Sequence, residues 1–409
     1  MAQAINVCST PVVTRLYTPA QMGVIALFIS FFTFWSPALS LRYEYALLIA
    51  KDDAESHVVL RLAVAVVVGM SFLGLPVLWG LHRAEVLGFG LLPDWAPLAG
   101  VAILLGYGVF MVYRSWALRA GIVKQITKAT VMRSAASATT SIALGLLTGG
   151  IPALFAAQFM ASWAAMLKLT RNVRRHFVSS RPERVLGREI AAAAKRYVKF
   201  PLFETPSTWV NQLTASLPVP MIVTLFGASA AGWYGLARTI VGIPNAQIGT
   251  AVADVFQMEV SSAVVAGDAT RVRGLFYKLM RKLALIGLLP MVGVMVLCPL
   301  LVPWVFGHAW REAGYVAAII APWMYVALIV SPLSGVLSAL QAQEYKLIYD
   351  VVSIVLIAVA FLLAKAWHLG LLQFIAALSA TAMLGYIVYA IVIVAVVEAR
   401  LRTVAHGAD

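Results

Sequence analysis

The sequence predicts an all-α integral membrane protein, and three observations carry this prediction. Of its 409 residues, 62% are hydrophobic and only 12% are charged, whereas soluble domains average about 25% charged residues. The mean hydropathy is +0.89, and apolar stretches recur along the whole chain. Stretches such as Val101–Met111 and Val351–Ala364 are apolar on every face, unlike the alternating strands of a membrane barrel. Because backbone in lipid must satisfy its own hydrogen bonds, these stretches are predicted to be helices.

Hydrophobic segments divide the chain into about twelve predicted spans. A membrane helix needs about 20 residues, and most of the segments reach that length. The fifth and sixth meet at a tight turn around Gly149, Gly150 and Pro152. The predicted spans are residues 1–17, 20–41, 58–80, 96–113, 134–149, 150–168, 200–225, 230–256, 283–305, 316–340, 348–367 and 372–397.

The positions of the basic residues predict the orientation. Of the 31 lysines and arginines, 26 fall in the connections after the even-numbered spans and in the C-terminal tail. Such an excess marks the cytoplasmic side, so both termini are predicted to be cytoplasmic. The net charge of +14 is therefore explained mostly by basic residues that set the orientation in the membrane, and these residues are also expected to contact anionic lipid headgroups. A nucleic-acid partner is not expected.

A basic linker predicts two six-helix halves. Residues 168–199 hold ten basic side chains and separate an N-terminal lobe (1–167) from a C-terminal lobe (200–397), with a cytoplasmic tail at 398–409. An offset of 209 residues pairs Gly23 with Gly232, and it also pairs Pro11, Leu16 and Leu27 with identical residues. Because six is an even number of spans, the two halves are predicted to form a parallel repeat.

Catalytic and metal-binding patterns are absent from the sequence. No lysine follows a glycine, which excludes a GxxxxGK[ST] phosphate loop. The histidines are isolated, and Cys8 and Cys298 lie in apolar segments, so neither a metal site nor a cofactor is expected. The longest outward loops, 81–95 and 306–315, are short for a polymerase or ligase. We therefore expect a transporter and not an enzyme.

Polar residues inside the seventh and eighth spans are the candidate substrate contacts. In the eighth span Arg238, Gly242 and Asn245 share one helical face, and ionisable side chains at bilayer depth usually face a cavity. In the seventh span Asn211 and Gln212 lie two turns after Glu204. Two hypotheses stay open for Arg238: contact with a diphosphate or acidic sugar, or a structural tie to Glu204.

A third candidate lies at the end of the second span. Arg42 and Glu44 occur in the run Arg-Tyr-Glu-Tyr. They are predicted either to gate the cytoplasmic mouth of a pathway or to cap the second helix.

Two groups of motifs resemble bacterial polysaccharide or O-antigen flippases of the multidrug/oligosaccharidyl-lipid/polysaccharide exporter superfamily. The opening motifs are TRLYTP at 14–19, LRYEYA at 41–46 and KDD at 51–53. The later motifs are KFP at 199–201, LPVP at 217–220, FG at 226–227 and GWYGLAR at 232–238, followed by Ile243-Pro244.

The resemblance implies a fold and a cargo. It implies two six-helix lobes forming a V, with the first, second, seventh and eighth helices around a central cavity. It implies transfer of an undecaprenyl-diphosphate-linked oligosaccharide across a bacterial inner membrane by alternating access, for exopolysaccharide, capsule or O-antigen assembly. The implied partners are the polyprenyl-diphosphate-linked oligosaccharide, the lipid bilayer, a proton or sodium ion coupled through Glu204, and polysaccharide polymerase machinery. Members of the family begin about twenty residues earlier, so the first helix is expected to be incomplete.

Three alternatives accompany this reading. On the same fold, the cargo could be a drug or cation exchanged by an antiporter, or a peptidoglycan precursor. A membrane polymerase or ligase is disfavoured by the short outward loops. A scaffold without transport activity would follow if the first helix is truncated.

Overall fold

A computed structural model describes residues 1–176, 187–244, 249–340, 342 and 344–406, and every regular element in these ranges is a helix. Packing divides the chain into two compact units, residues 1–232 and 233–409. The division falls inside one helix, after Gly232. The predicted lobe boundary at residues 168–199 stays a prediction.

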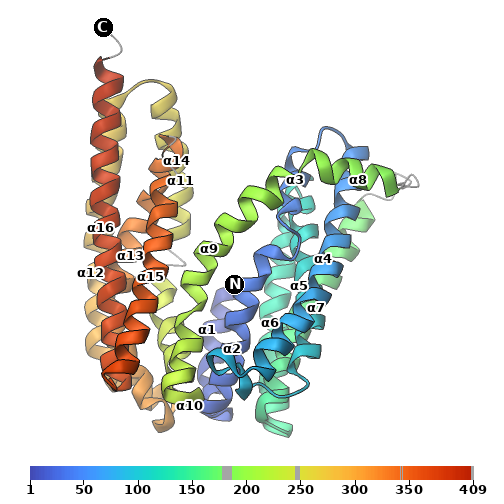
Figure 1. Ribbon diagram of the computed structural model, residues 1–409, viewed down its shortest axis with the longest axis vertical. Coiled ribbons are helices and arrows are strands. Elements are labelled where there is room, and N and C mark those ends of the chain that lie inside the picture. The colour runs from blue at the N-terminus through green and yellow to red at the C-terminus, as the bar shows by residue number, and fades with distance from the viewer. Residues whose placement is uncertain (177–186, 245–248, 341, 343, 407–409) are drawn as a thin grey trace. The chain divides into compact units, whose positions relative to one another are not determined.

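Unit 1 is a bundle of helices that run back and forth (Figure 1). Two of these helices begin at a side-chain cap. Thr18 and Gln21 form a reciprocal capping box at the start of α2, and Asp52 accepts a hydrogen bond from the Glu55 amide at the start of α4 (2.7 Å). The helices are α1 (Ala2–Leu16), α2 (Pro19–Trp35), η1 (Ser36–Ala38), α3 (Tyr43–Ile49), α4 (Asp53–Arg83), η2 (Val86–Leu91), α5 (Ala96–Arg119), α6 (Val123–Leu147), α7 (Gly150–His176), α8 (Gly187–Arg196), η3 (Phe200–Glu204), α9 (Thr205–Ser216) and the first part of α10 (Pro218–Pro244).

Unit 2 contains the rest of α10 and the C-terminal helices. One core cluster joins α11, α12 and α16 with the end of α13, around buried side chains such as Phe256, Phe276 and Ile393. The helices are α11 (Thr250–Val265), α12 (Ala269–Phe306), η5 (His308–Trp310), α13 (Arg311–Leu333), α14 (Gly335–Ala339), α15 (Glu344–Ala366) and α16 (Leu371–His406).

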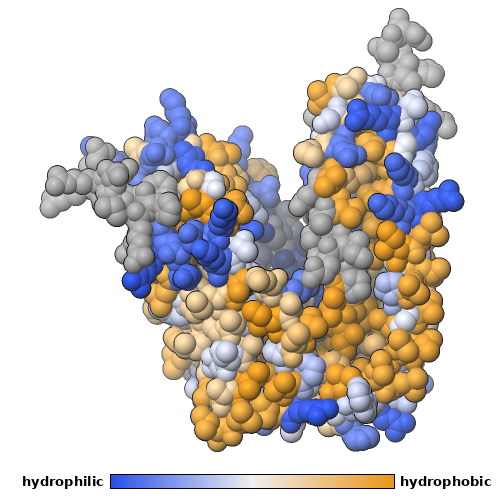
Figure 2. Space-filling view, turned by 180° about the vertical axis from the view of Figure 1, so that it is seen from behind, coloured by the Kyte–Doolittle hydropathy of each residue, from blue (hydrophilic) through white to orange (hydrophobic). Residues whose placement is uncertain are grey.

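Nine helical runs of the described chain are long and apolar enough to cross a membrane. The surface agrees with this, because hydrophobic side chains cover the flanks of the units and hydrophilic ones gather at their ends (Figure 2). On α12 the side chains of Leu289 and Trp304 are 80% and 78% exposed, and apolar exposure on that scale requires lipid or a partner protein. The predicted all-α membrane fold is therefore confirmed, whereas the predicted number of twelve spans stays a prediction.

Three of the predicted spans differ from the observed helices. The predicted span 134–149 is the end of α6, which begins eleven residues earlier at Val123. Predicted span seven and the first part of predicted span eight belong to one helical run, 200–243, with a sharp turn at Gly227 (φ 82°, ψ 177°). The last part of span eight, from residue 250, belongs to α11. The backbone conformation at Gly227 is open mainly to glycine, which explains why the turn falls at this residue.

Two glycines bring α2 and α10 into backbone contact within unit 1. A Cβ atom on Gly23 would lie 1.7 Å from the Ala228 carbonyl oxygen, and one on Gly232 would lie 2.0 Å from the Pro19 carbonyl oxygen. The offset of 209 pairs Gly23 with Gly232 and Pro19 with Ala228, so the two contacts are reciprocal. Parallel repeats related by a two-fold axis along the membrane normal produce contacts of this kind.

Candidate substrate site

Arg238 lies deep within α10. It follows the turn at Gly227 by eleven residues, which is about 16 Å along the helix axis. Its side chain is half-buried and interacts electrostatically with the hydroxyl of Tyr234, one turn earlier, whose side chain is 2% exposed. Ionisable side chains deep in a membrane helix usually face the bundle interior or a water-filled cavity.

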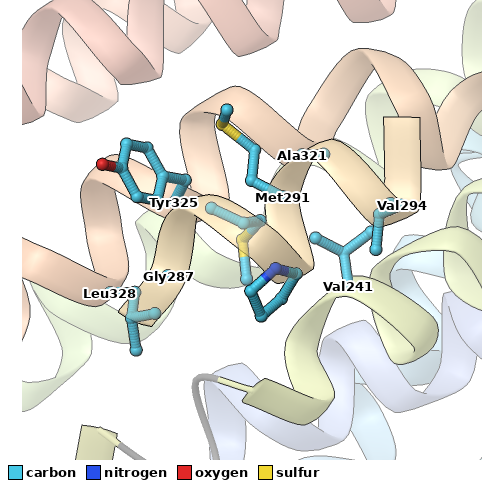
Figure 3. Close-up of a pocket in the computed structure, with 9 residues that line it drawn as sticks. Val241, Gly287, Met291, Val294, Ala321, Tyr325 and Leu328 are labelled. Carbon is cyan, nitrogen blue, oxygen red and sulfur yellow. The ribbon is translucent and has the colours of Figure 1, made fainter. Parts of the chain in front are cut away.

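An apolar pocket begins one turn beyond Arg238, at Val241 (Figure 3). It lies inside unit 2, between α10, α12 and α13, and comprises about 290 Å³ of space that is partly open to the outside. This volume includes open space at the mouth, so the pocket is a shallow apolar depression and not an enclosed cavity. The lining residues are Val241, Gly287, Pro290, Met291, Val294, Ala321, Met324, Tyr325 and Leu328.

The pocket offers hydrocarbon contact and almost no polar contact. The hydroxyl of Tyr325 donates a hydrogen bond to the carbonyl of Ala284 (2.9 Å), and the other lining side chains carry no N–H or O–H group. Gly287 allows α12 to pack closely against α13 beside the pocket, because a Cβ there would meet Leu328 at 2.9 Å. Arg238 therefore places a positive charge about one helical turn from an apolar pocket, so the two together could contact a ligand with a charged end and an apolar chain.

The other predicted contacts occupy two regions. Gly242 is half-buried on the same helix as Arg238, and Asn245 lies outside the described residues. Asn211 is exposed and Gln212 is half-buried on α9. Glu204 is exposed at the end of the short π-helical segment η3. Glu204, Asn211 and Gln212 belong to unit 1 and Arg238 to unit 2, so the tie between Arg238 and Glu204 stays a prediction.

Arg42 and Glu44 form a buried ion pair at the beginning of α3. An Nη atom of Arg42 lies 3.3 Å from an Oε atom of Glu44, and the side chains are 14% and 5% exposed. The Ser40 hydroxyl donates a second hydrogen bond to Glu44. Leu41 and Arg42 both have positive φ angles, which turn the chain sharply into α3. The contacts of this pair are local to the beginning of α3, and both predicted roles, a gate and a cap of the second helix, stay hypotheses.

A further cation lies inside a long helix whose polar side chains keep its hydropathy below that of a typical span. Arg133 appeared to lie in a cytoplasmic loop, since threonine, serine and lysine side chains between 124 and 134 lower the hydropathy below that of a typical span. The structure places it inside α6, ten residues after Val123. Helical periodicity of the hydroxyl side chains was the available signal.

The sequence matches a known protein family over most of its length. The profile of the family described as polysaccharide biosynthesis protein matches residues 12–314. A curated relative, the lipopolysaccharide biosynthesis protein WzxC of Escherichia coli (strain K12), is 27% identical over 115 residues. That match covers 28% of this chain and 23% of WzxC, so this chain aligns with about a quarter of that relative.

Solved structures with similar folds are membrane transporters. An inward-facing multidrug resistance MATE family transporter of the MOP superfamily superposes with a TM-score of 0.78 at 15% identity, over 98% of this chain and 96% of that one. The lipid II flippase MurJ, in an inward closed conformation, gives 0.71 at 9% identity, over 95% and 86%. The resemblance seen in the sequence motifs is thereby confirmed. The chain belongs to the polysaccharide biosynthesis protein family and has the MOP-superfamily fold.

Proposed function

We propose that this protein is a flippase that transfers an undecaprenyl-diphosphate-linked oligosaccharide from the cytoplasmic to the periplasmic leaflet of a bacterial inner membrane. In this proposal the protein works by alternating access and supplies repeat units to exopolysaccharide, capsule or O-antigen assembly. Membership in the polysaccharide biosynthesis family supports the cargo class, and the fold supports transport over catalysis.

One observation in the structure favours a lipid-linked anion as cargo. Arg238 precedes the apolar pocket at Val241 by three residues, a rise of about 4.5 Å along the helix. A polyprenyl diphosphate has the same arrangement, with a charged diphosphate joined directly to a hydrocarbon chain. In the proposed complex Arg238 binds the diphosphate through its planar, five-donor guanidinium, and the first isoprene units enter the pocket.

The same observation separates this proposal from a drug antiporter. A cationic drug requires a carboxylate at the site, whereas the charged side chain next to the pocket is an arginine. A peptidoglycan precursor is also a lipid-linked diphosphate and shares this chemistry, so the phenotype must distinguish the two. Loss of a peptidoglycan flippase stops growth, whereas loss of a polysaccharide flippase removes surface polymer.

Deletion of the gene tests the function. We expect the surface polysaccharide to disappear and lipid-linked repeat units to accumulate in the cytoplasmic leaflet, measured by extraction and by accessibility to an external glycosidase. The strain with the unmodified gene restored is the control. Unchanged polysaccharide in the deletion strain would show that the proposal is wrong.

Substitution of Arg238 tests its contact with the cargo. We expect Arg238→Ala to accumulate in the membrane normally and to reduce polymer export by about tenfold or more, since a hydrogen-bonded charge contact contributes about 1.5–3 kcal/mol. Arg238→Lys keeps the charge but loses the bidentate geometry, so it is expected to restore part of the activity. An Arg238→Ala protein that fails to accumulate would favour the structural tie instead. Normal export by a normally accumulating variant would exclude the contact.

Ion coupling through Glu204 and the cytoplasmic placement of both termini belong to the same proposal. The exposed carboxylate of Glu204 can exchange a proton or hold a sodium ion. We expect Glu204→Gln to fold normally and to make transport in proteoliposomes independent of an imposed ion gradient. Gradient dependence equal to that of the unsubstituted protein would reject this role. Asn211, Gln212, Gly242 and Asn245 are proposed as neutral contacts to the oligosaccharide, and the polymerase machinery as the recipient of the cargo.

A further inference from the structure

Arg133 lies level with the middle of α5, a candidate membrane helix of unit 1. Its guanidinium carbon is 4.9 Å from the ring centroid of Tyr107 on α5. Tyr107 follows Ala96, the first residue of α5, by eleven residues and precedes Arg119, the last one, by twelve. Tyr107 therefore lies about 17 Å from either end of a helix that spans the bilayer, and the stacked guanidinium shares its depth.

The surroundings of Arg133 are aromatic and hydroxylated. Phe32 of α2 packs edge-on against Tyr107, with ring centroids 4.8 Å apart. Arg133, Tyr107 and Phe32 are all half-buried, so three helices meet at a partly open place. On α6 the residues Thr130, Ser137 and Thr140 lie three positions before, four after and seven after Arg133, which puts three hydroxyl groups on its face.

No carboxylate of the described residues lies within ion-pair distance of Arg133, because the described ion pairs all involve other cations. The other described arginine–aromatic contacts lie at or beyond helix ends, as for Arg83 over Trp79 in the last two turns of α4. A cation at bilayer depth is costly unless water or an anion compensates it. Stacking on the ring face of Tyr107 contributes to holding the cation, yet leaves the N–H groups at the edge of the guanidinium available to an acceptor.

We propose that Arg133, held by Tyr107, is an anion-binding site in unit 1, separate from Arg238 in unit 2. It binds a phosphate or carboxylate group of the cargo through the guanidinium edge, and the hydroxyl face of α6 contacts neighbouring polar groups. The choice of ligand rests on the proposed function, but binding itself is measured independently of transport.

Binding to the purified full-length protein tests this site. The probe is geranylgeranyl diphosphate, a short polyprenyl diphosphate, with geranylgeraniol as the uncharged control and glucuronate as the carboxylate alternative. Affinity is measured in detergent by microscale thermophoresis, and thermal unfolding checks that each variant is folded. Because Arg238 is also proposed to bind a diphosphate, the variants are compared in an Arg238→Ala parent protein. In that parent we expect Arg133→Gln to weaken binding of the diphosphate by about tenfold or more and to leave geranylgeraniol binding unchanged. If the lost affinity is for glucuronate and not for the diphosphate, the site binds the acidic sugar.

Arg83→Gln is the matched control, because it also removes an arginine stacked on an aromatic ring, but an exposed one at a helix end. It is expected to bind all three probes normally. If Arg133→Gln does not accumulate, Arg133→Lys replaces it, with an expected loss of about threefold since the charge is kept. Affinities for both anions equal to those of the Arg238→Ala parent, in whichever variant folds, would overturn the site. Surface polymer that survives gene deletion would refute the flippase while leaving an Arg133-dependent affinity intact.

Discussion

Replacement of Gly23 by alanine is expected to prevent normal packing of unit 1. The new Cβ would lie 1.7 Å from the carbonyl oxygen of Ala228, and a backbone atom cannot move aside as the end of a side chain can. Overpacking of a well-packed core costs about 1–3 kcal/mol, and this contact is tighter, so we expect a loss of more than about 3 kcal/mol. The measurement is the amount of monodisperse protein after detergent extraction, together with its thermal unfolding midpoint.

Two further glycine substitutions make the experiment specific, one at the reciprocal contact and one at a position with free space around it. Gly232→Ala is expected to have an effect as large, because its Cβ would lie 2.0 Å from the Pro19 carbonyl oxygen. Gly69→Ala, in the middle of α4, is the matched control, since nothing lies within 4 Å of its added Cβ. Alanine favours a helix over glycine by about 1 kcal/mol, so this control is expected to be neutral or stabilising. Equal behaviour of Gly23→Ala and Gly69→Ala would contradict the close crossing of α2 and α10.

Removal of the Glu44 carboxylate is expected to produce the second large loss of stability. Glu44 is 4% exposed and accepts hydrogen bonds from Arg42 and Ser40. Breaking a buried ion pair from one side costs about 3–5 kcal/mol, because an uncompensated charge stays behind. We expect Glu44→Ala to cost about 3 kcal/mol, since Arg42 keeps some access to water. Chemical unfolding followed by tryptophan fluorescence provides the measurement.

An exposed ion pair supplies the comparison. Glu398 accepts hydrogen bonds from Arg273 and Tyr277, but the Arg273 side chain is 48% exposed. Solvent screens such pairs, and their contribution is typically about 0–1 kcal/mol, so Glu398→Ala is expected to change stability little. The pair of variants also tests the gate hypothesis for Arg42 and Glu44. A gate predicts that Glu44→Ala keeps its stability and alters transport, whereas the structural role predicts a loss of stability first.

The sequence was sufficient for the fold class and the family, and the reasons are physical. Long apolar segments have few alternatives to helices in lipid, so α4, α5, α13 and α15 could be located closely. The beginning of α6 could not be located from the sequence. Hydropathy is averaged over all faces of a helix, so polar side chains on one face lower the value for the whole helix. The turn at Gly227 lies between two predicted spans, yet an unbroken apolar run gave no sign of how sharply it bends.

Side-chain environments were less predictable than helices. Arg238 was identifiable because a lone arginine interrupts an apolar segment, and its depth follows from helical rise. The pocket beyond Val241 combines residues of three helices up to about 90 positions apart, which no local pattern reports. The burial of Glu44 depends likewise on tertiary packing, so a gate and a structural pair could not be separated from sequence. Tyr107 became significant only when α6 brought Arg133 onto its ring.

The crossing of Gly23 with Ala228 also has a consequence for biosynthesis. The two residues are separated by about 200 positions, and at roughly 5–20 residues per second translation takes on the order of 10–40 s to cover that distance. During this interval α2 is already in the membrane while its backbone contact on α10 has not been made. The N-terminal helices therefore stay in lipid, or beside the insertion machinery, while the face of α2 that packs on α10 has no partner. A fragment that stops within residues 168–199 is expected to keep this face of α2 unpacked. The first half therefore completes its packing only after α9 and α10 have been synthesised and inserted.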